Sequence, residues 1–251
     1  MHITKVLIAA IVLVLVCRST EAEQKTAKQT KQTKQTKANS PFAQVNDDPK
    51  LPRVLIIGDS ISIGYTLDAR KLLAGTANVH RVPTNAGHTG MGIAGLPKWL
   101  DKKNGKWDVI HFNWGLWDLC YRNRESKTQG NRDKVGGQVT FSPETYAANL
   151  QEIVDVLKQI DAELVFATTT PVPDKELGRK LGDDVVYNKH AVEIMKNNGI
   201  AVNDLHAAIA PDMAKYQVAE GNVHFKPAGS KLLAEHVAKA IKDALSRRKT
   251  K

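Results

Sequence analysis

A serine after a short aliphatic run and a histidine near the C-terminus have the residue types and settings of a nucleophile and its base. Residues 54–57 are aliphatic and lead into Gly58-Asp59-Ser60, while Val223-His224-Phe225-Lys226-Pro227 directly precedes a helical pattern. A serine hydroxyl becomes nucleophilic near neutral pH when a neighbouring histidine takes its proton. We therefore predict that Ser60 is the nucleophile and His224 the base. Taken singly, each has a plainer explanation, Ser60 as a helix cap and His224 as a surface residue.

Two further segments carry groups that suit a developing oxyanion. Residues 84–92 contain three glycines, and the backbone N–H of Gly87 is a candidate donor, as is the N–H of Ser60 at a helix N-terminus. In residues 109–114, the amide of Asn113 lies at the end of an apolar run and is a third candidate donor. The alternatives are a plain flexible loop at 84–92 and an Asn113 that ties down its own loop.

The elements that must position these groups alternate between short apolar runs and amphipathic stretches. This alternation predicts an α/β fold, with a parallel sheet of about five strands between two layers of helices. In such sheets ligands bind beyond the carboxyl ends of the strands, where the residues named above lie. The predicted strands are residues 54–57, 79–82, 109–114, 164–168 and 200–202, and the predicted helices are residues 61–74, 142–160, 183–198 and 227–246.

The N-terminal fifty residues have a different composition from the rest. Residues 5–16 are a lysine and an apolar run too short to cross a bilayer, followed by small residues, so 1–22 is predicted to be a signal peptide cleaved after Ala22. A form anchored in the membrane, or by lipid at Cys17, is the alternative. Residues 23–50 are rich in lysine, glutamine and threonine and are predicted to be a flexible linker. These features predict a secreted or periplasmic protein with no stable membrane insertion after cleavage.

The net charge of +10 lies mainly in the linker and in a basic tail at 247–251, so residues 51–246 are nearly neutral. A nucleic-acid-binding domain carries its basic surface on the fold itself, and we therefore expect no nucleic-acid partner. The chain has two cysteines, of which only Cys120 remains after cleavage. This excludes an intrachain disulfide and a cysteine-based metal site in the mature chain.

Together these motifs resemble the SGNH/GDSL hydrolases, a family of serine esterases and lipases, along nearly all of residues 51–246. Gly58-Asp59-Ser60 and the His224 block are similar to the first and last family motifs, and Gly87 to the glycine of the second. Residues 166–173 are similar to a secreted bacterial branch. The resemblance implies a flavodoxin-like three-layer sandwich and ester hydrolysis through an acyl-serine intermediate, with no cofactor and no metal.

Two positions depart from the family pattern. The third family motif is Gly-x-Asn-Asp, and here Trp117 stands in place of its asparagine, so either Trp117 or Asn113 is expected to complete the oxyanion hole. The family usually has an aspartate three residues before its histidine, a position taken here by Gly221. Glu220 is the predicted orienting carboxylate, and a Ser–His dyad is the alternative.

The substrate is predicted to be a small-molecule or carbohydrate ester, with O-acetyl groups on a carbohydrate as the leading candidate. Aromatic residues near the site pack well on sugar rings. The polar segment 121–140 is long and basic, which suits a substrate-facing loop and a carboxylated or sulfated glycan. A lysophospholipase or thioesterase activity, and a non-catalytic glycan-binding protein, are the alternatives. The residues predicted to contact substrate are Asp59, His88, Trp114 and Asp118.

Overall fold

The computed structural model describes residues 40–249. The predicted signal peptide, the linker up to residue 39, and residues 250–251 lie outside the described residues. The fold below is that of residues 44–249, which belong to one of the two units of the chain.

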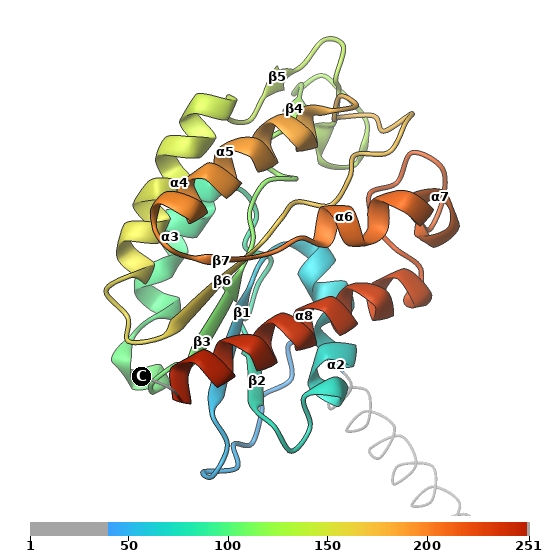
Figure 1. Ribbon diagram of the computed structural model, residues 1–251. Helices are drawn as coiled ribbons and strands as arrows, with labels where there is room; N and C mark the ends of the chain where they lie inside the picture. Colours follow the sequence, from blue (N-terminus) through green and yellow to red (C-terminus); the bar gives the residue numbers. More distant parts are fainter. Residues whose placement is uncertain (1–39, 250–251) are drawn as a thin grey trace, which may run out of the picture. The chain divides into compact units, whose positions relative to one another are not determined.

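A five-stranded sheet, parallel throughout, forms the centre of this unit, as the alternating pattern predicts (Figure 1). The strand order is β2-β1-β3-β6-β7. Because β1 pairs with β2 on one side and with β3 on the other, the chain leaves β1 and β3 in opposite directions. In such sheets ligands bind at the carboxyl ends of the strands where the direction changes. The strands are β1 (Arg53–Ile57), β2 (Asn78–Arg81), β3 (Val109–Phe112), β6 (Glu163–Ala167) and β7 (Ala201–Asn203).

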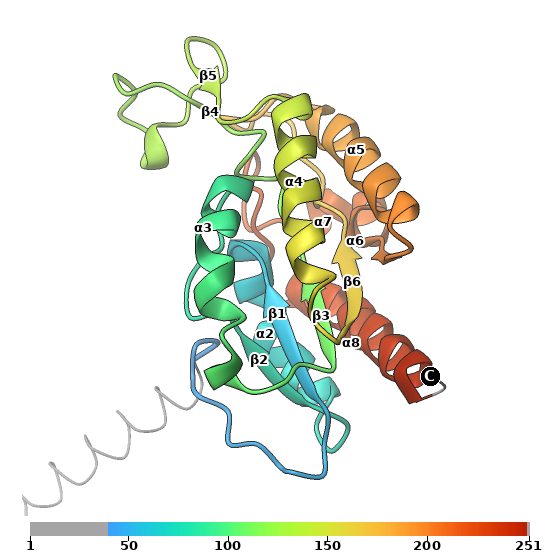
Figure 2. The same cartoon turned by 90° about the vertical axis from the view of Figure 1, so that its left-hand side faces the viewer.

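Helices cover both faces of the sheet. One face carries α2 and α8, which pack against each other, and the other carries α3, α4 and α5 in a row (Figure 2). This arrangement is the predicted α/β/α sandwich. None of the helices within residues 40–249 is long and apolar enough to cross a membrane. The helices are α2 (Ser60–Leu72), α3 (Thr89–Trp99), α4 (Pro143–Leu157), α5 (Asp183–Asn197), α6 (Leu205–Ile209), α7 (Met213–Tyr216) and α8 (Pro227–Lys249), with single 3₁₀ turns at Lys102–Asn104, Gln129–Asn131 and Ala210–Asp212.

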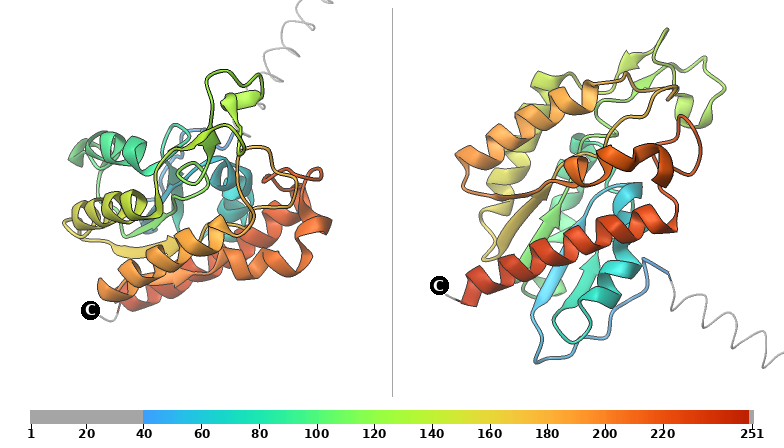
Figure 3. Two further views of the ribbon diagram at one scale, coloured as in Figure 1. Left: turned by 90° about the horizontal axis from the view of Figure 1, so that it is seen from above. Right: turned by 45° about the vertical axis from the view of Figure 1, so that its right-hand side comes forward.

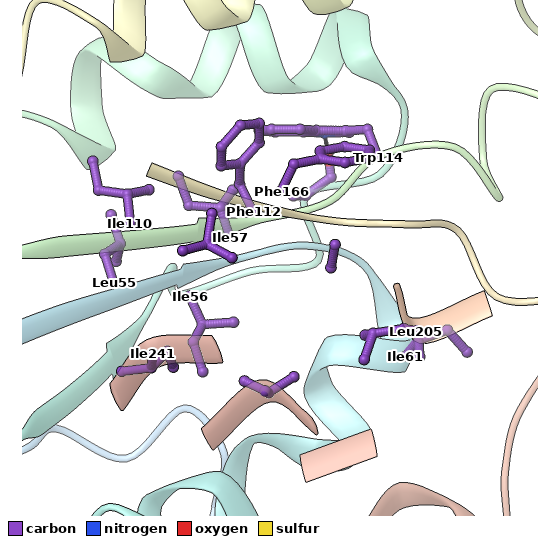
Figure 4. Packing of buried hydrophobic residues seen from close by; sticks show 14 of the residues in the cluster. Leu55, Ile56, Ile57, Ile61, Ile110, Phe112, Trp114, Phe166, Leu205 and Ile241 are labelled. Carbon is purple, nitrogen blue, oxygen red and sulfur yellow. Dashed lines mark hydrogen bonds between the residues drawn. The ribbon is translucent and has the colours of Figure 1, made fainter. Parts of the chain in front are cut away.

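Buried strand residues explain why the sheet forms where it does. Successive side chains of a strand point to opposite faces, so Ile56 lies toward Ile241 of α8 while Ile57 lies on the side of Phe112 and Phe166 (Figure 4). The rings of Phe112 and Phe166 meet edge to face, with centroids 5.5 Å apart. Both faces are therefore apolar, which produces the continuous aliphatic runs seen in the sequence.

Helix α3 is not among the predicted helices, and it begins inside residues 84–92, for which a flexible loop was the alternative interpretation. The helix forms although it contains several glycines and Pro97. Its glycines serve close packing: a Cβ on Gly92 would lie 2.6 Å from the Trp114 ring, and one on Gly95 would lie 2.4 Å from the Trp99 ring. From the sequence alone, a glycine that allows an aromatic ring to pack closely cannot be distinguished from a glycine in a flexible loop.

The end of α8 also differs from the prediction. The helix continues past Ser246 to Lys249, so the first residues of the predicted basic tail are helical. Arg248 contacts Asp108 at 3.0 Å and Asp161 at 3.1 Å, and Arg247 contacts Glu163 at 3.5 Å. These ion pairs at the amino-terminal end of β6 extend the helix.

Residues 121–140 form a separate layer beyond the carboxyl end of the sheet. They contain a two-stranded antiparallel hairpin, β4 (Tyr121–Arg122) with β5 (Gln138–Val139) (Figure 3). Backbone hydrogen bonds from Tyr121 N to Gly178 O and from Lys134 N to Leu177 O attach this hairpin to the segment that leads into α5. The loop is thus anchored at both of its ends.

Candidate active site

The turn between β1 and α2 presents Ser60 at the carboxyl end of the central strand. Asp59 caps α2, since its buried Oδ1 accepts a hydrogen bond from the N–H of Ile61 at 2.9 Å. Ser60 is the first residue of the helix and is partly exposed. No acceptor among the described residues pairs with its backbone N–H, so this donor is available to a ligand.

His224 faces this serine from the loop before α8. The distance from its Nε2 to Ser60 Oγ is 2.9 Å, although 164 residues separate the two in sequence. The structure therefore brings together the two residues on which the predicted chemistry depends. This is hydrogen-bond geometry for transfer of a proton from the hydroxyl to the ring.

Asn222 occupies the place at which an orienting carboxylate was expected. Its Oδ1 accepts from the backbone N–H of His224 at 2.9 Å and lies 2.8 Å from the ring Nδ1. An amide oxygen accepts only from a protonated nitrogen, so this contact places the hydrogen on Nδ1 and leaves Nε2 free to accept from Ser60.

The prediction for Glu220 is not met by the structure. Its carboxylate is exposed and contacts Lys175 Nζ at 2.7 Å, away from the ring of His224. The sequence does contain a signal for Asn222. Asparagine side chains in turns commonly accept a hydrogen bond from the backbone N–H two residues further on, which here is that of His224. Because the family position carries an acid, the residue type of Asn222 alone did not indicate this role.

The surroundings of His224 favour its neutral form, mainly through desolvation. Desolvation by the surrounding protein lowers the pKa of His224, and the guanidinium groups of Arg179 and Arg132 lower it further. The carboxyl of Asp59 opposes this, but burial raises the pKa of Asp59 itself. A neutral imidazole is the form that accepts a proton.

The three candidate oxyanion donors other than Ser60 differ in whether their N–H groups already have acceptors within the protein. Asn113 donates from Nδ2 to Ala167 O at 2.8 Å, so its amide ties β3 to β6. Gly87 has a φ of +60°, and its N–H is paired with Asn85 Oδ1 at 2.9 Å. Trp117 is partly exposed, and no hydrogen bond of its indole N–H is found among the described residues. Its ring lies 5.0 Å below the guanidinium of Arg122.

Three of the four residues predicted to contact substrate are buried and bonded within the protein. Trp114 is fully buried and donates from Nε1 to Ala86 O at 3.3 Å. Asp118 is also fully buried, and its Oδ1 accepts from the N–H and the hydroxyl of Thr89 at 2.9 and 2.6 Å. Asp59 is the cap of α2. These three residues support the loops and the helix that form the site rather than facing solvent, which corrects the prediction of direct contact with substrate.

His88, the fourth, is half-buried and caps α3 through Nδ1, which accepts from Met91 N at 3.3 Å. Its ring meets that of Phe141 edge to face at 5.1 Å. Within residues 40–249, no group of three His, Cys, Asp or Glu side chains is placed to hold a metal ion.

Comparisons with solved structures agree with this architecture. The chain is similar to the acetyl xylan esterase AlAXEase, with a TM-score of 0.59 and 15% identity, covering 75% of this chain and 99% of that one. It is similar to the lipase/acylhydrolase from Enterococcus faecalis, with a TM-score of 0.59 and 20% identity over 76% of this chain and 96% of that one. For Axe2, an acetylxylan esterase from Geobacillus stearothermophilus, the TM-score is 0.57 and the identity 17%, over 76% and 94% of the two chains. At these identities the likeness shows a shared fold.

The family follows from the sequence itself. No curated protein matches the chain as a relative. The family model of the GDSL-like lipases and acylhydrolases, however, matches residues 56–232, a span that begins in β1 before the Ser60 turn and ends in α8 after His224. The protein therefore belongs to the GDSL-like lipase/acylhydrolase family and is a hydrolase of ester bonds.

Proposed function

We propose that the protein is a secreted carboxylic ester hydrolase with a Ser60–His224–Asn222 triad, acting on O-acetyl groups of a carbohydrate. The observation that carries the catalytic proposal is the hydrogen-bonded series from Ser60 Oγ through the His224 ring to Asn222 Oδ1. The acetyl group is supported by two structurally similar proteins that are acetyl xylan esterases. Export is supported by the composition of residues 1–22.

The proposed reaction has two steps. His224 Nε2 takes the proton of Ser60 while Oγ attacks the ester carbonyl, and the same nitrogen then gives the proton to the leaving alcohol. A water molecule repeats the sequence on the acyl-serine, so one ester and one water give one acid and one alcohol. Asn222 holds the Nδ1 hydrogen throughout and keeps Nε2 directed at Ser60.

The developing oxyanion requires N–H donors. We assign this role to the backbone N–H of Ser60 and the indole N–H of Trp117, because neither has an acceptor among the described residues. Gly87 joins them when its N–H moves from Asn85 Oδ1 to the substrate. Asn113 is not included, because its amide already serves Ala167 O.

The experiment is acyl transfer with and without the serine hydroxyl. The purified mature protein is expected to release p-nitrophenol from p-nitrophenyl acetate faster than from the octanoate ester. Ser60→Ala is expected to abolish release, whereas Ser246→Ala, which removes a hydroxyl from the outer face of α8, is expected to leave it unchanged. In intact-protein mass spectra, a fluorophosphonate probe should add one adduct to the wild type and none to Ser60→Ala. Undiminished turnover in Ser60→Ala would refute the proposal.

A further inference from the structure

A buried carboxylate beside the active site is shared by two arginines. Glu176 is fully buried, and its Oε1 lies 2.9 Å from the Nη1 atoms of both Arg132 and Arg179. Arg132 comes from the hairpin loop and Arg179 from the segment before α5. Two positive charges and one negative charge leave this group with an excess of one positive charge.

Backbone contacts place this group beside the catalytic residues. Arg179 donates from Nε to Leu116 O at 2.6 Å, next to the proposed oxyanion donor Trp117. The backbone of Lys175 and Glu176 packs so closely on Gly221 that a Cβ there would lie 2.7 Å from Lys175 O. Gly221 has a φ of +70° and begins the turn that carries His224. The charges of both arginines also act on the pKa of His224.

Both guanidinium groups retain donors that the fold does not use. Arg132 donates from Nε to Gln129 O and from Nη1 to Glu176. Arg179 donates from Nε to Leu116 O and from Nη1 to Glu176. Their Nη2 atoms have no acceptor among the described residues, and neither atom is sealed from solvent. The Arg179 side chain is only 6% exposed, so nearly all of it is enclosed by the protein.

A purely structural role does not require this arrangement. One arginine would balance Glu176 and attach the hairpin loop to the segment before α5. The second adds a positive charge that Glu176 does not balance, and a second open donor. The carboxyl of Asp59 also interacts with Arg179, but burial raises the pKa of that carboxyl. A buried charge is costly unless it gains a partner, and the natural partner of a planar guanidinium is a carboxylate.

We propose that Arg132 and Arg179 form a subsite for a carboxylate carried by the ester substrate. This inference rests on the proposed function, because the carboxylate belongs to the ester that Ser60 and His224 are proposed to hydrolyse. The carboxylate belongs either to the acyl group, as in a half-ester of a dicarboxylic acid, or to the alcohol, as in an acetylated uronic acid.

The test compares esters that differ only in this charge. On the acyl side, mono-p-nitrophenyl succinate is compared with methyl p-nitrophenyl succinate, in which the carboxylate is replaced by an uncharged methyl ester, and the rate without enzyme is subtracted for each. On the alcohol side, acetylated methyl glucuronide is compared with acetylated methyl glucoside. The wild type is expected to show a higher kcat/KM for the carboxylated member of one pair, and the pair that responds identifies which part of the substrate carries the charge. Assays at pH 8 keep His224 neutral in every variant.

Arg132→Gln removes the more accessible guanidinium and leaves Glu176 paired with Arg179. It is expected to reduce the ratio of kcat/KM for the carboxylated ester to kcat/KM for its uncharged partner about tenfold. Arg132→Lys should restore part of the preference because it keeps the charge. The matched control is Arg124→Gln, which removes an exposed arginine of the same loop that does not contact Glu176.

The outcomes separate the two proposals. Turnover of p-nitrophenyl acetate with no preference in either pair would overturn the subsite and leave the esterase proposal standing. So would a loss in Arg132→Gln that is equal for charged and neutral esters. Absence of turnover on every ester would refute the proposed function and the subsite with it.

Discussion

The amide of Asn222 gives the sharpest test of the catalytic geometry. Asn222→Asp keeps the oxygen that lies 2.8 Å from His224 Nδ1 and accepts from His224 N, and it replaces the amide nitrogen by a second oxygen. The substitution therefore adds one negative charge without changing the shape of the site. That charge attracts the imidazolium and leaves the neutral ring almost unaffected, so it raises the pKa of His224.

The size of the shift follows from the separation of the charges. With charge centres about 4 Å apart, a carboxylate and an imidazolium attract by about 1 kcal/mol in water and about 4 kcal/mol at an effective dielectric constant of 20. One pKa unit corresponds to about 1.36 kcal/mol. Because His224 is exposed, the lower half of this range applies, and we expect a rise of about 1 to 2 units.

The assay is the pH dependence of kcat/KM for p-nitrophenyl acetate at constant ionic strength. Its acidic limb reports the pKa of the base in the free enzyme. In the wild type this limb should lie below pH 6.5, because the protein lowers the pKa of His224 from that value. In Asn222→Asp it should lie about 1 to 2 pH units higher than in the wild type, with a faster rate on the alkaline plateau because the imidazolium that forms during the reaction is stabilised.

Glu220→Gln is the control, since it removes a negative charge two residues from Asn222. Glu220 is exposed and paired with Lys175, so its loss should move the acidic limb by no more than about 0.3 units. A limb that stays in place in Asn222→Asp would refute the assignment of Asn222. A shift in Glu220→Gln, together with an unchanged limb in Asn222→Asp, would restore Glu220 as the orienting residue.

Two further predictions concern groups behind the site. Burial raises the pKa of Asp118 from 3.8 to about 7, so between these values the folded chain holds a proton that the unfolded chain releases, and stability falls as the pH rises. The shift of about 3 units corresponds to about 4 kcal/mol of unfolding free energy. Measured by urea unfolding, Asp118→Asn should therefore lose less stability between pH 4.5 and 7 than the wild type loses. Equal losses in the two proteins would contradict this. Trp117→Phe keeps the ring and removes the indole N–H, so kcat should fall about 10²-fold with little change in KM. An unchanged kcat would show that the oxyanion is bound without Trp117.

The fold was predictable because its signals are local and repeated. Strands β1 and β6 show runs of apolar residues, and α4 shows its Ser142 cap with Pro143 in the first turn. The exception is α3, which the sequence pattern does not predict for a definite reason. Its glycines are selected by the Trp114 and Trp99 rings, and the contact between a glycine and a distant ring leaves no periodic pattern in the sequence.

The site was predictable only in part, for a related reason. Ser60 and His224 carry motifs, so their meeting followed from the order of the strands. Trp114 and Asp118 have residue types that suit substrate contact, and only three-dimensional packing shows that they point into the protein. Arg179 lies in a segment without a motif, and its distance from His224 depends on the way residues 175–176 cross over Gly221.

Compared with an orienting aspartate, both the amide of Asn222 and the two arginines leave the imidazolium form of His224 less stable. An amide stabilises the imidazolium less than a carboxylate does, and the nearby guanidinium groups destabilise it further. Such a histidine stays neutral at lower pH but is a weaker base, so its rate depends on any negative charge that arrives during binding. A substrate carboxylate held by Arg132 and Arg179 supplies a negative charge close to the ring. In this arrangement the orienting residue need not be an acid, because the substrate itself brings the negative charge that an aspartate would provide.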